Sequence, residues 1–576
     1  MAVLTIAPVV PLLLMINLVA RHGVDIPFAD EWTLAPLFVK AQEHKITFMD
    51  LFMQWHEHRM VLPKLIFIAC TVWAGGNMRI EMFLSVLLAA GSAINLLLIL
   101  RRSSLPPAKL LLVATLMNLL VFSPVQVESW TWGVQLTVFL VSYLLTTGIC
   151  IASSRLSIGK KFVACAVIAF LASFSFGNGM LSWGLTFPVA FAGLDKSARR
   201  SLLPWLYGWI ITGLFTISAY FIGYTKTAEH PPLAASRHVT DYYLYVAAFV
   251  GAPLSRSGRA ESLIIPVLLG TLLLIIYVSA VAYAFAGRRA KAQKLLAPWF
   301  ALGAFALLSA CMAALARIGF GLTEALASRS TTFGMSLSVA VVAIVAIGAP
   351  LVRSDAGSQS RLIDAVGRTE AAALALFSAM FLTSAVWGIL EMKSFERTRL
   401  WGKGALHFGN VLDTSRVVAT FLGGNAADVM RFARMDNSMG LLHPALAKSR
   451  YIRDLAAVRT TQPPVGFINH ESSTVAGACV VSGWAVLPSR SRAADCVVLT
   501  LRAEETSGEY AFAVNDELED RPDVARKLGR PELVRCGWRV HFDRLKIPAG
   551  EQRIGAWALD ANSGILYQLA GEMVLH

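Results

Sequence analysis

Long apolar runs recur through this chain up to residue 390, and many of them approach the length that crosses a bilayer. One helical crossing needs about 20 apolar residues, and runs of this kind recur roughly eleven times. The expected spans are 2–20, 80–100, 109–123, 132–152, 162–176, 180–194, 203–223, 262–285, 295–316, 332–352 and 370–390. Hydrophobic residues make up 56% of the 576 residues and charged residues only 15%, which excludes an ordinary soluble protein. We therefore predict a mainly α-helical, polytopic transmembrane bundle.

Two of the apolar stretches near the N-terminus need separate treatment. Residues 2–20 follow no basic region and precede no clear small-residue cleavage site, so we expect a retained first span rather than a signal peptide. The run LIFIACTVWAGG, which starts at Leu65, is too short to cross a bilayer. We predict that it forms a helix at the membrane surface.

Basic residues set the expected orientation. Lys and Arg gather in the loops at 101–109, 155–161, 196–200, 288–294 and 353–368. Loops rich in Lys and Arg stay in the cytoplasm. Alternation therefore places outside the loops 21–79, 124–131, 224–261 and 317–331 and the tail after residue 390. These loop residues explain much of the net charge of +14, so we do not expect a nucleic-acid partner.

The tail changes its periodicity part-way. Residues 391–462 are polar and follow a helical pattern, which predicts an external helical linker. From about residue 463 the period becomes two, as in CVVLTL at 496–501, and turn signals separate the runs. This pattern is typical of a small antiparallel β-sandwich. We predict a transmembrane module over 1–390, a linker over 391–462 and a β-domain over 463–576.

The chain has seven cysteines, and those in apolar stretches show no metal-ligand spacing. Four lie in apolar stretches, where packing is the expected role: Cys70, Cys150, Cys165 and Cys311. Three lie in the tail, at Cys479, Cys496 and Cys536. One disulfide among these three is allowed in an external domain, and the sequence does not select the pair.

Ionisable residues are concentrated outside the predicted spans. Apart from end positions such as Glu81 and Glu370, the spans contain no Asp, Glu, Lys or Arg. An ion-coupled transporter usually needs such groups near the midplane. The dense group between Asp30 and Arg79 lies on the external side instead, which favours chemistry on a lipid head group.

Three carboxylates are candidates for the chemistry. Asp30 and Glu31 follow the first span, and a carboxylate there can take the proton of an attacking hydroxyl. The alternative for Asp30 is a capping role in the following helix. Glu128 lies in a second external loop between aromatic residues, and its alternative is a solvated acid beside Trp130 and Trp132.

A basic cluster follows the first acidic pair. Arg59 and Lys64, with His56 and His58, fit an anion site because guanidinium binds phosphate bidentately and ammonium adds a point charge. The alternatives are basic side chains that reach the head groups and, less favoured by the spacing, a histidine metal site. Arg317 and Arg329, near the ends of two later spans, are weaker candidates for the same phosphate site.

Three short motifs give the chain a resemblance to a known superfamily. FADEW at 28–32, HEHRMVLPKL at 56–65 and GGNMR at 75–79 follow the order found in GT-C integral membrane glycosyltransferases, which use polyprenyl-phosphate sugars. The resemblance implies that Asp30 activates the acceptor and that Glu128 is the second acidic residue. The chain departs from the superfamily where it has His-Glu-His-Arg in place of Lys-Pro-Pro and Ser-Arg-Ser in place of an Arg-Tyr pair. The β-domain, with GWAVLP and CGWRVHF, is similar to domains beside bacterial glycan-modifying enzymes.

The resemblance implies a glycosyltransferase of the bacterial inner membrane with its active site in the periplasm. The expected partners are a polyprenyl-phosphate sugar, a lipid-linked or polymeric cell-envelope glycan and membrane lipid. Glu31 and Glu128 would position the acceptor or hold a divalent metal, whose involvement stays open. A glycan or lipid-carrier transporter with an external binding domain, and a non-catalytic receptor, are the alternatives.

Overall fold

The computed structural model divides the chain into two compact units. Unit 1 comprises Met1–Gly23, Ile46–Ala69 and Arg79–Lys393. Unit 2 comprises Val24–Lys45, Cys70–Met78 and Ser394–His576. The structure describes the chain except at residues 1–6, 104, 228–229, 256–261, 287–288, 356–359, 460–463, 470–472, 476–477, 489–491, 504–507, 545–546, 549–551 and 576. The segment between the first two predicted spans is thus shared between the units.

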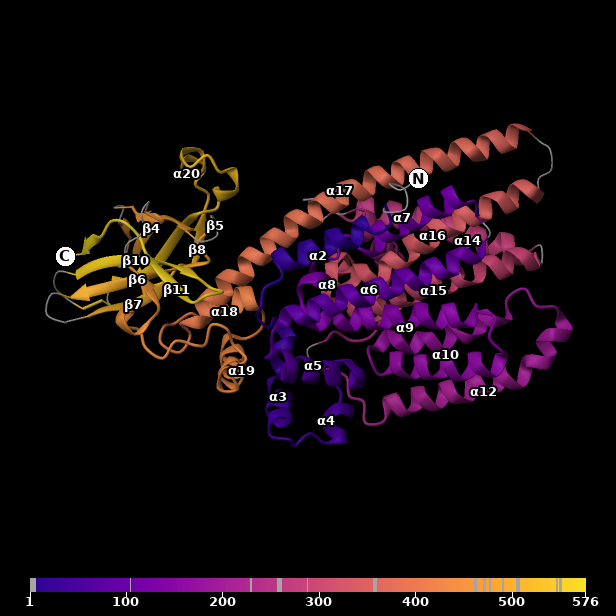
Figure 1. Cartoon of the computed structure of the whole chain (residues 1–576), viewed down its shortest axis with the longest axis horizontal. Helices are drawn as coiled ribbons and strands as arrows, with labels where there is room; N and C mark the ends of the chain where they lie inside the picture. Colours follow the sequence, from indigo (N-terminus) through magenta and orange to yellow (C-terminus); the bar gives the residue numbers. More distant parts are fainter. Residues whose placement is uncertain are drawn as a thin grey trace. The chain divides into compact units, whose positions relative to one another are not determined.

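Unit 1 is a bundle of α-helices (Figure 1). Its helices are α2 (Val10–His22), α4 (Phe48–Phe52), α6 (Met78–Leu100), α7 (Pro107–Val121), α8 (Val127–Thr131), α9 (Leu136–Ala152), α10 (Ile158–Ser173), α11 (Ser182–Leu185), α12 (Lys196–Phe221), α13 (Val239–Gly251), α14 (Ile264–Ala286), α15 (Ala290–Arg317) and α16 (Ser328–Asp355). Helices α5 (Val61–Ala74) and α17 (Ser360–His407) contribute to both units. The largest core of unit 1 contains Trp299, Phe305 and Leu337, where α15 packs along α16.

Six helical segments in the described part of the chain are long and apolar enough to cross a membrane. They are Met78–Ser103, Gly133–Ala152, Lys196–Phe221, Ile264–Ala286, Ala290–Phe320 and Ser328–Ser354. The shorter apolar helices Val10–His22, Val61–Ala74 and Pro107–Val121 accompany them. The predicted mainly helical character is confirmed. The first residues of the predicted first span lie outside the described residues.

Two segments differ from the predicted span pattern. Residues 180–194, expected as one span, form only short turns, α11 and the 3-10 segment Phe187–Phe191, which has a proline in its first turn. The expected external loop 224–261 contains α13, which packs against α14 in the bundle. A Cβ on Gly270 would lie 1.8 Å from the Ala247 carbonyl oxygen, so the missing side chain permits this close approach. A 13-residue apolar helix is too short to have been recognised as a span.

Unit 2 contains the predicted β-region (Figure 1). One six-stranded sheet has the order β1-β11-β10-β6-β7, with β12 beside β10, and the other has the order β2-β4-β9-β8, with β3 and β5 beside β4. The strands are β1 (Ala457–Val458), β2 (Gly466–Ile468), β3 (Ser473–Val475), β4 (Ala478–Leu487), β5 (Arg492–Ala493), β6 (Cys496–Ala503), β7 (Glu509–Val514), β8 (Glu517–Glu519), β9 (Gly537–Asp543), β10 (Gln552–Asp560), β11 (Ile565–Gln568) and β12 (Met573–Leu575). Among the strand pairs that the structure describes, β1 with β11 is parallel and the others are antiparallel.

The period of two in β6 has a direct structural basis. Val497, Leu499 and Leu501 share a core with residues of the other sheet, such as Val481 and Val540. Cys496 and Val498 belong instead to a second core, which contains Trp401 of α17. Both faces of β6 are therefore buried, because successive side chains point to opposite sides of a strand.

The second core of unit 2 also takes in the start of the first loop. The 3-10 segment η1 (Ala29–Leu34) and α3 (Ala35–Gln42) pack against α19 (Ala426–Ser438), and α18 (Ser415–Leu422) lies beside α19. Trp32 and Ala35 are buried in this core. A further short helix, α20 (Pro522–Lys527), completes the unit. The thiols of Cys479, Cys496 and Cys536 are buried and free, so no disulfide joins them.

Candidate functional site

Glu128 sits at the start of α8 and faces the first turn of α16. Its carboxylate accepts hydrogen bonds from the Ser328 hydroxyl at 2.8 Å and from the Arg329 backbone N–H at 3.0 Å. The Arg329 guanidinium pairs with the same carboxylate at 3.6 Å. A helix N-terminus has unsatisfied N–H groups and a partial positive charge, so it stabilises an ionised carboxylate. The structure thus joins two predicted site residues that are distant in sequence.

A chain of alternating charges extends from Arg329. Its guanidinium contacts Glu324, whose carboxylate lies 3.6 Å from the guanidinium of Arg317. Arg317 in turn donates to Glu57 at 2.7 Å. His230 Nδ1 lies 3.1 Å from the same Glu57 oxygen. We call Glu57, Glu128, His230, Arg317, Glu324 and Arg329 the ion-pair chain.

The ion-pair chain is partly open to its surroundings. Its side chains are between 18% and 33% exposed. Burial raises the pKa of Glu57, but the Arg317 guanidinium, a backbone hydrogen bond and His230 act in the opposite direction, and the net pKa is below its ordinary value. Each of the two arginines is shared between two carboxylates. Guanidinium has five N–H donors, so each arginine can pair with both of its carboxylates at once.

His58 lies beside this chain in a neutral form. Burial, the largest influence, lowers the pKa of His58 to about 4. Its Nδ1 accepts the Gly177 N–H at 3.3 Å, so the proton of the neutral ring is on Nε2. The ring also packs on Phe176, with 3.7 Å between the ring centroids. His58 is therefore a neutral N–H donor and carries no positive charge.

Arg59 and Lys64 are engaged with backbone carbonyl groups. Arg59 is buried and donates to the carbonyls of Phe52, Tyr220 and Ile222. The Lys64 ammonium donates to the carbonyls that end α4, Asp50 at 2.9 Å, Leu51 at 3.3 Å and Met53 at 2.7 Å. Burial, its main cause, lowers the pKa of Lys64 to about 8. Both cations hold the segment around α4 in place, and neither belongs to the ion-pair chain.

His56 has a more local setting. Its backbone adopts a positive φ of 48°, and its carbonyl accepts from the Gln54 side-chain amide. Its ring packs edge-on against Trp55, with 4.6 Å between centroids. Within the described residues, no group of three or more His, Cys, Asp and Glu side chains has the arrangement of a metal site.

Asp30 and Glu31 belong to unit 2. Asp30 is exposed, and its carbonyl accepts from the Thr33 hydroxyl at 2.6 Å. Glu31 is only 4% exposed, and its carboxylate accepts from the Phe28 N–H at 3.0 Å. Glu31 therefore reaches back to the backbone at the start of η1.

Asp436 is another buried carboxylate of unit 2. It is 3% exposed in α19, and its Oδ1 has no hydrogen-bond partner among the described residues. Burial, followed by the charge of Glu31, raises the pKa of Asp436 to about 7. Its position has a sequence signal, because Val429, Phe432, Ala433 and Asp436 recur on the buried face of one helix.

Comparison with family models, curated proteins and solved structures gave no match to this chain. The site is therefore described by its geometry alone.

Sequence reasoning anticipated only some members of the ion-pair chain. Glu128, Arg317 and Arg329 were predicted site residues, and they lie together. Glu57, Glu324 and His230 were missed. Glu57 stands inside the His-Glu-His-Arg group, where its acidity among basic residues was the available signal. Glu324 lies in the 3-10 segment Leu322–Leu326 and His230 in a loop, and neither stretch has a distinguishing sequence pattern.

Proposed function

We propose that this chain is a membrane glycosyltransferase. It moves a sugar from a polyprenyl-phosphate donor to a lipid-linked or polymeric cell-envelope glycan on the periplasmic face of the inner membrane. The observation that carries the proposal is the ion-pair chain, which sets two arginines among three carboxylates at the ends of apolar helices. Guanidinium is suited to phosphate, and carboxylates are suited to proton transfer and acceptor binding.

The donor phosphate binds in this proposal to Arg317 and Arg329. A phosphate oxygen competes with Glu324 for the two guanidinium groups, and His58 adds a neutral N–H. Negative charge develops on the phosphate as the bond between it and the anomeric carbon breaks, and the arginines stabilise this charge.

An acceptor hydroxyl attacks the anomeric carbon in the same step. Its oxygen forms the new glycosidic bond, its proton passes to a carboxylate, and polyprenyl phosphate leaves with the bonding electrons. The superfamily resemblance assigns the proton acceptor to Asp30, which is exposed. Glu128 positions the acceptor, while the buried Glu31 supports the segment that carries Asp30.

The test is transfer by the purified full-length protein. Radiolabelled polyprenyl-phosphate sugars would be incubated with an envelope glycan extract and with wild type, Asp30→Asn, Glu128→Gln or the control Glu43→Gln. A general base typically contributes about 10²- to 10⁴-fold, so Asp30→Asn should lower the rate by at least about 100-fold. Glu43 pairs only locally with Lys45 at 2.8 Å, and its variant should keep wild-type activity.

The outcomes separate the parts of the proposal. Equal transfer by wild type and Asp30→Asn would remove Asp30 from the mechanism. Equal transfer by wild type and Glu128→Gln would show that the ion-pair chain has no part in the mechanism. If no donor gave any transfer, the glycosyltransferase function would be rejected.

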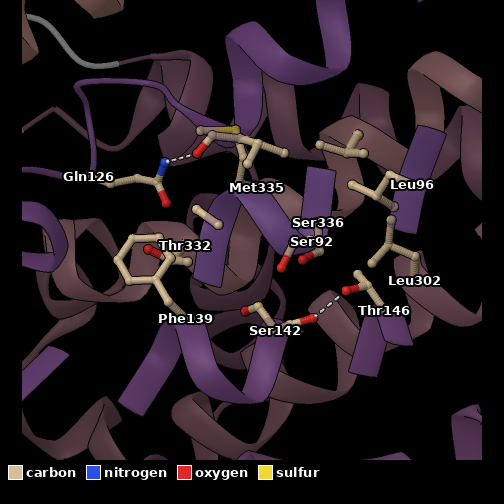
Figure 2. Close-up of a pocket in the computed structure, with 13 residues that line it drawn as sticks. Ser92, Leu96, Gln126, Phe139, Ser142, Thr146, Leu302, Thr332, Met335 and Ser336 are labelled. Carbon is tan, nitrogen blue, oxygen red and sulfur yellow. Dashed lines mark hydrogen bonds between the residues drawn. The ribbon is translucent and has the colours of Figure 1, made fainter. Parts of the chain in front are cut away.

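A transporter of a glycan or lipid carrier is the second candidate. It is favoured by an uncharged cavity within the helices of unit 1, lined by Ser92, Ser142 and Thr332 among others (Figure 2). Reconstituted protein should then move a fluorescent polyprenyl-phosphate sugar between leaflets without changing it. Retention of the label in its original leaflet would rule out this function.

A further inference from the structure

The short helix α4, which is not one of the candidate spans, presents large apolar side chains to its surroundings. Phe48 is 69% exposed, Met49 is 57% exposed, and Met53, which directly follows the helix, is 58% exposed. We call these three side chains the α4 patch. Scattered exposed apolar residues are ordinary in proteins, but three within one short segment form a patch that marks an interaction surface.

The ionisable groups beside the α4 patch are bound to polar groups at the two ends of α4. Asp50 accepts from the Thr47 N–H at 2.9 Å and from the Thr47 hydroxyl at 2.7 Å. At the other end, the Lys64 ammonium donates to three carbonyl groups. Polar groups can enter an apolar medium only when they have hydrogen-bond partners. The polar groups named here have such partners within the protein.

Hydrogen bonds hold α4 beside the carboxyl end of α12 (Figure 1). The Gln54 side-chain amide donates to the Thr225 carbonyl at 2.6 Å and accepts from the Thr225 N–H at 3.0 Å. The buried Arg59 donates to the carbonyl of Phe52 in α4 at 2.7 Å and to that of Tyr220 in α12 at 2.5 Å. These bonds fix the place of the α4 patch relative to α12.

The surface of α12 is apolar up to its carboxyl end. This helix is long and apolar enough to cross a membrane. Ile211 in its middle is 67% exposed, and Phe221 and Ile222 at its end are 49% and 66% exposed. No Asp, Glu, Lys or Arg occurs from residue 201 to residue 225. The α4 patch therefore adjoins the end of an uncharged surface that suits the interior of a bilayer.

We propose that the α4 patch is immersed in the bilayer leaflet at the carboxyl end of α12. A lipid surface is the partner that the chemistry favours, because the patch is apolar and adjoins the exposed apolar end of a candidate span. An interfacial helix of this kind buries its apolar side chains about 5–10 Å into the boundary between head groups and acyl chains. The flexible methionine side chains adapt readily to irregular apolar surroundings.

Immersion of α4 also sets the depth of the ion-pair chain. The Glu57 carbonyl accepts from the hydroxyl groups of Tyr220 at 3.4 Å and Tyr224 at 3.2 Å, at the same end of α12 that holds α4. The Glu57 carboxylate pairs with Arg317. The ion-pair chain therefore lies near the level of the lipid head groups. The use of this level to meet a lipid-linked phosphate rests on the proposed function, whereas the immersion of α4 does not.

The test is the depth of spin labels on the full-length protein in lipid nanodiscs. Nitroxides are attached to Met49→Cys and Met53→Cys in a background that carries Cys311→Ser, because Cys311 is exposed and the other six cysteines are buried. Power saturation of the label is measured with oxygen, which concentrates among acyl chains, and with a water-soluble nickel chelate.

Two further positions supply the controls. Ile211→Cys on α12 is the lipid-facing reference. Leu528→Cys is the matched control, because Leu528 is an apolar residue that is 43% exposed but follows the short helix α20 in unit 2. Thermal unfolding of each labelled variant identifies any that lose their fold.

Labels at Met49 and Met53 should be more accessible to oxygen than to the chelate, as at Ile211, and should report depths of about 5–10 Å below the lipid phosphates. The label at Leu528 should show the opposite order. Greater accessibility to the chelate at both α4 positions would place the patch in water and overturn the proposal. Low accessibility to both reagents would mean that protein, such as a second copy of this chain, covers the patch, and would overturn it too.

A second measurement uses the protein without any substitution. A phospholipid with a diazirine in its acyl chain is photolysed in the nanodiscs, and mass spectrometry should find lipid adducts on the peptide that contains residues 48–53. Adducts on α12 without any on this peptide would overturn the proposal. Neither measurement depends on catalysis. An immersed α4 patch in a protein that transfers no sugar would uphold this inference and reject the glycosyltransferase function, and transfer by a protein whose α4 lies in water would do the reverse.

Discussion

The carboxylates of the ion-pair chain in unit 1 and Asp436 in α19 of unit 2 have different surroundings. In unit 1, Glu57 and Glu128 each face a guanidinium and a further N–H donor or histidine. In unit 2, Asp436 is almost fully buried, and Glu31 is the charged neighbour that acts on its pKa. Burial favours the neutral form of an acid, and a positive neighbour favours the charged form.

The pKa values of the two acids are therefore shifted in opposite directions. The pKa of Glu57 is below its ordinary value because positive neighbours outweigh burial, whereas the pKa of Asp436 is raised to about 7 because burial and a like charge act together. Residue type alone does not decide which form an acid takes. The first region holds ionised groups for interaction with a charged ligand, and the second holds a proton.

Removing Arg329 should produce the largest effect in this comparison. Arg329→Met leaves Glu128 and Glu324 close together without their shared cation. Loss of one partner from a buried pair costs about 3–5 kcal/mol of unfolding free energy. Because this pair is partly exposed, we expect a loss at the lower end, about 3 kcal/mol. Thermal unfolding of unit 1 in nanodiscs measures the loss.

A double variant sharpens this prediction. Glu324→Gln removes one of the uncompensated charges, so Arg329→Met/Glu324→Gln should recover about 1 kcal/mol relative to Arg329→Met. Arg329→Lys keeps a charge but not the planar fork, and it should fall between wild type and Arg329→Met. A loss below about 0.5 kcal/mol for Arg329→Met would mean that the ion-pair chain is only a surface feature.

Asp436 should give an intermediate effect with a defined pH dependence. Between its ordinary pKa of 3.8 and its folded pKa of about 7, the folded state holds a proton that the unfolded state has lost. The stability of unit 2 therefore falls as pH rises through this range, and the full cost is present above pH 7. Asp436→Asn cannot ionise and should stabilise unit 2 by on the order of 2 kcal/mol at pH 8.

The measurement is the denaturation midpoint of unit 2, followed by the fluorescence of its tryptophans, at pH values from 5 to 8. The stabilisation by Asp436→Asn should shrink toward pH 5, where wild-type Asp436 is already neutral in the folded state. A constant difference across this range would show that the substitution acts through packing and not through ionisation.

The sequence predicted the general architecture because periodicity reports burial locally. The apolar runs of α6, α14, α15 and α16 are long enough to cross a membrane, and alternate side chains of β6 enter two different cores. Residues 180–194 were mispredicted as one span, since average apolarity does not reveal where a helix breaks. Helix α13 was missed because its 13 residues are fewer than a span needs.

The candidate site was less predictable because pairing and burial are tertiary properties. Glu128 and Arg329 were each singled out, but their contact joins residues 201 positions apart. His58 was grouped with the basic residues because of its residue type. Burial lowers its pKa to about 4, so the imidazole is neutral at pH 7. Asp436 recurs with Val429 and Phe432 at helical spacing in α19, so the sequence already indicated that this acid is buried.

Asp428 offers the smallest predicted effect and tests whether the behaviour of Asp436 comes from burial. Both acids lie in α19, but the Asp428 side chain is 59% exposed and pairs with an exposed Arg431 at 2.9 Å. Exposed pairs are usually worth less than about 1 kcal/mol, so Asp428→Asn should change the stability of unit 2 by about 0.5 kcal/mol or less. This small change should be a loss, because an acid in the first turn of a helix is favoured by the helix dipole, and it should stay constant from pH 6 to 8. If Asp428→Asn instead stabilised unit 2 at pH 8 as strongly as Asp436→Asn, the gain would come from lowering the negative charge of α19, and the buried proton of Asp436 would not be needed to explain it.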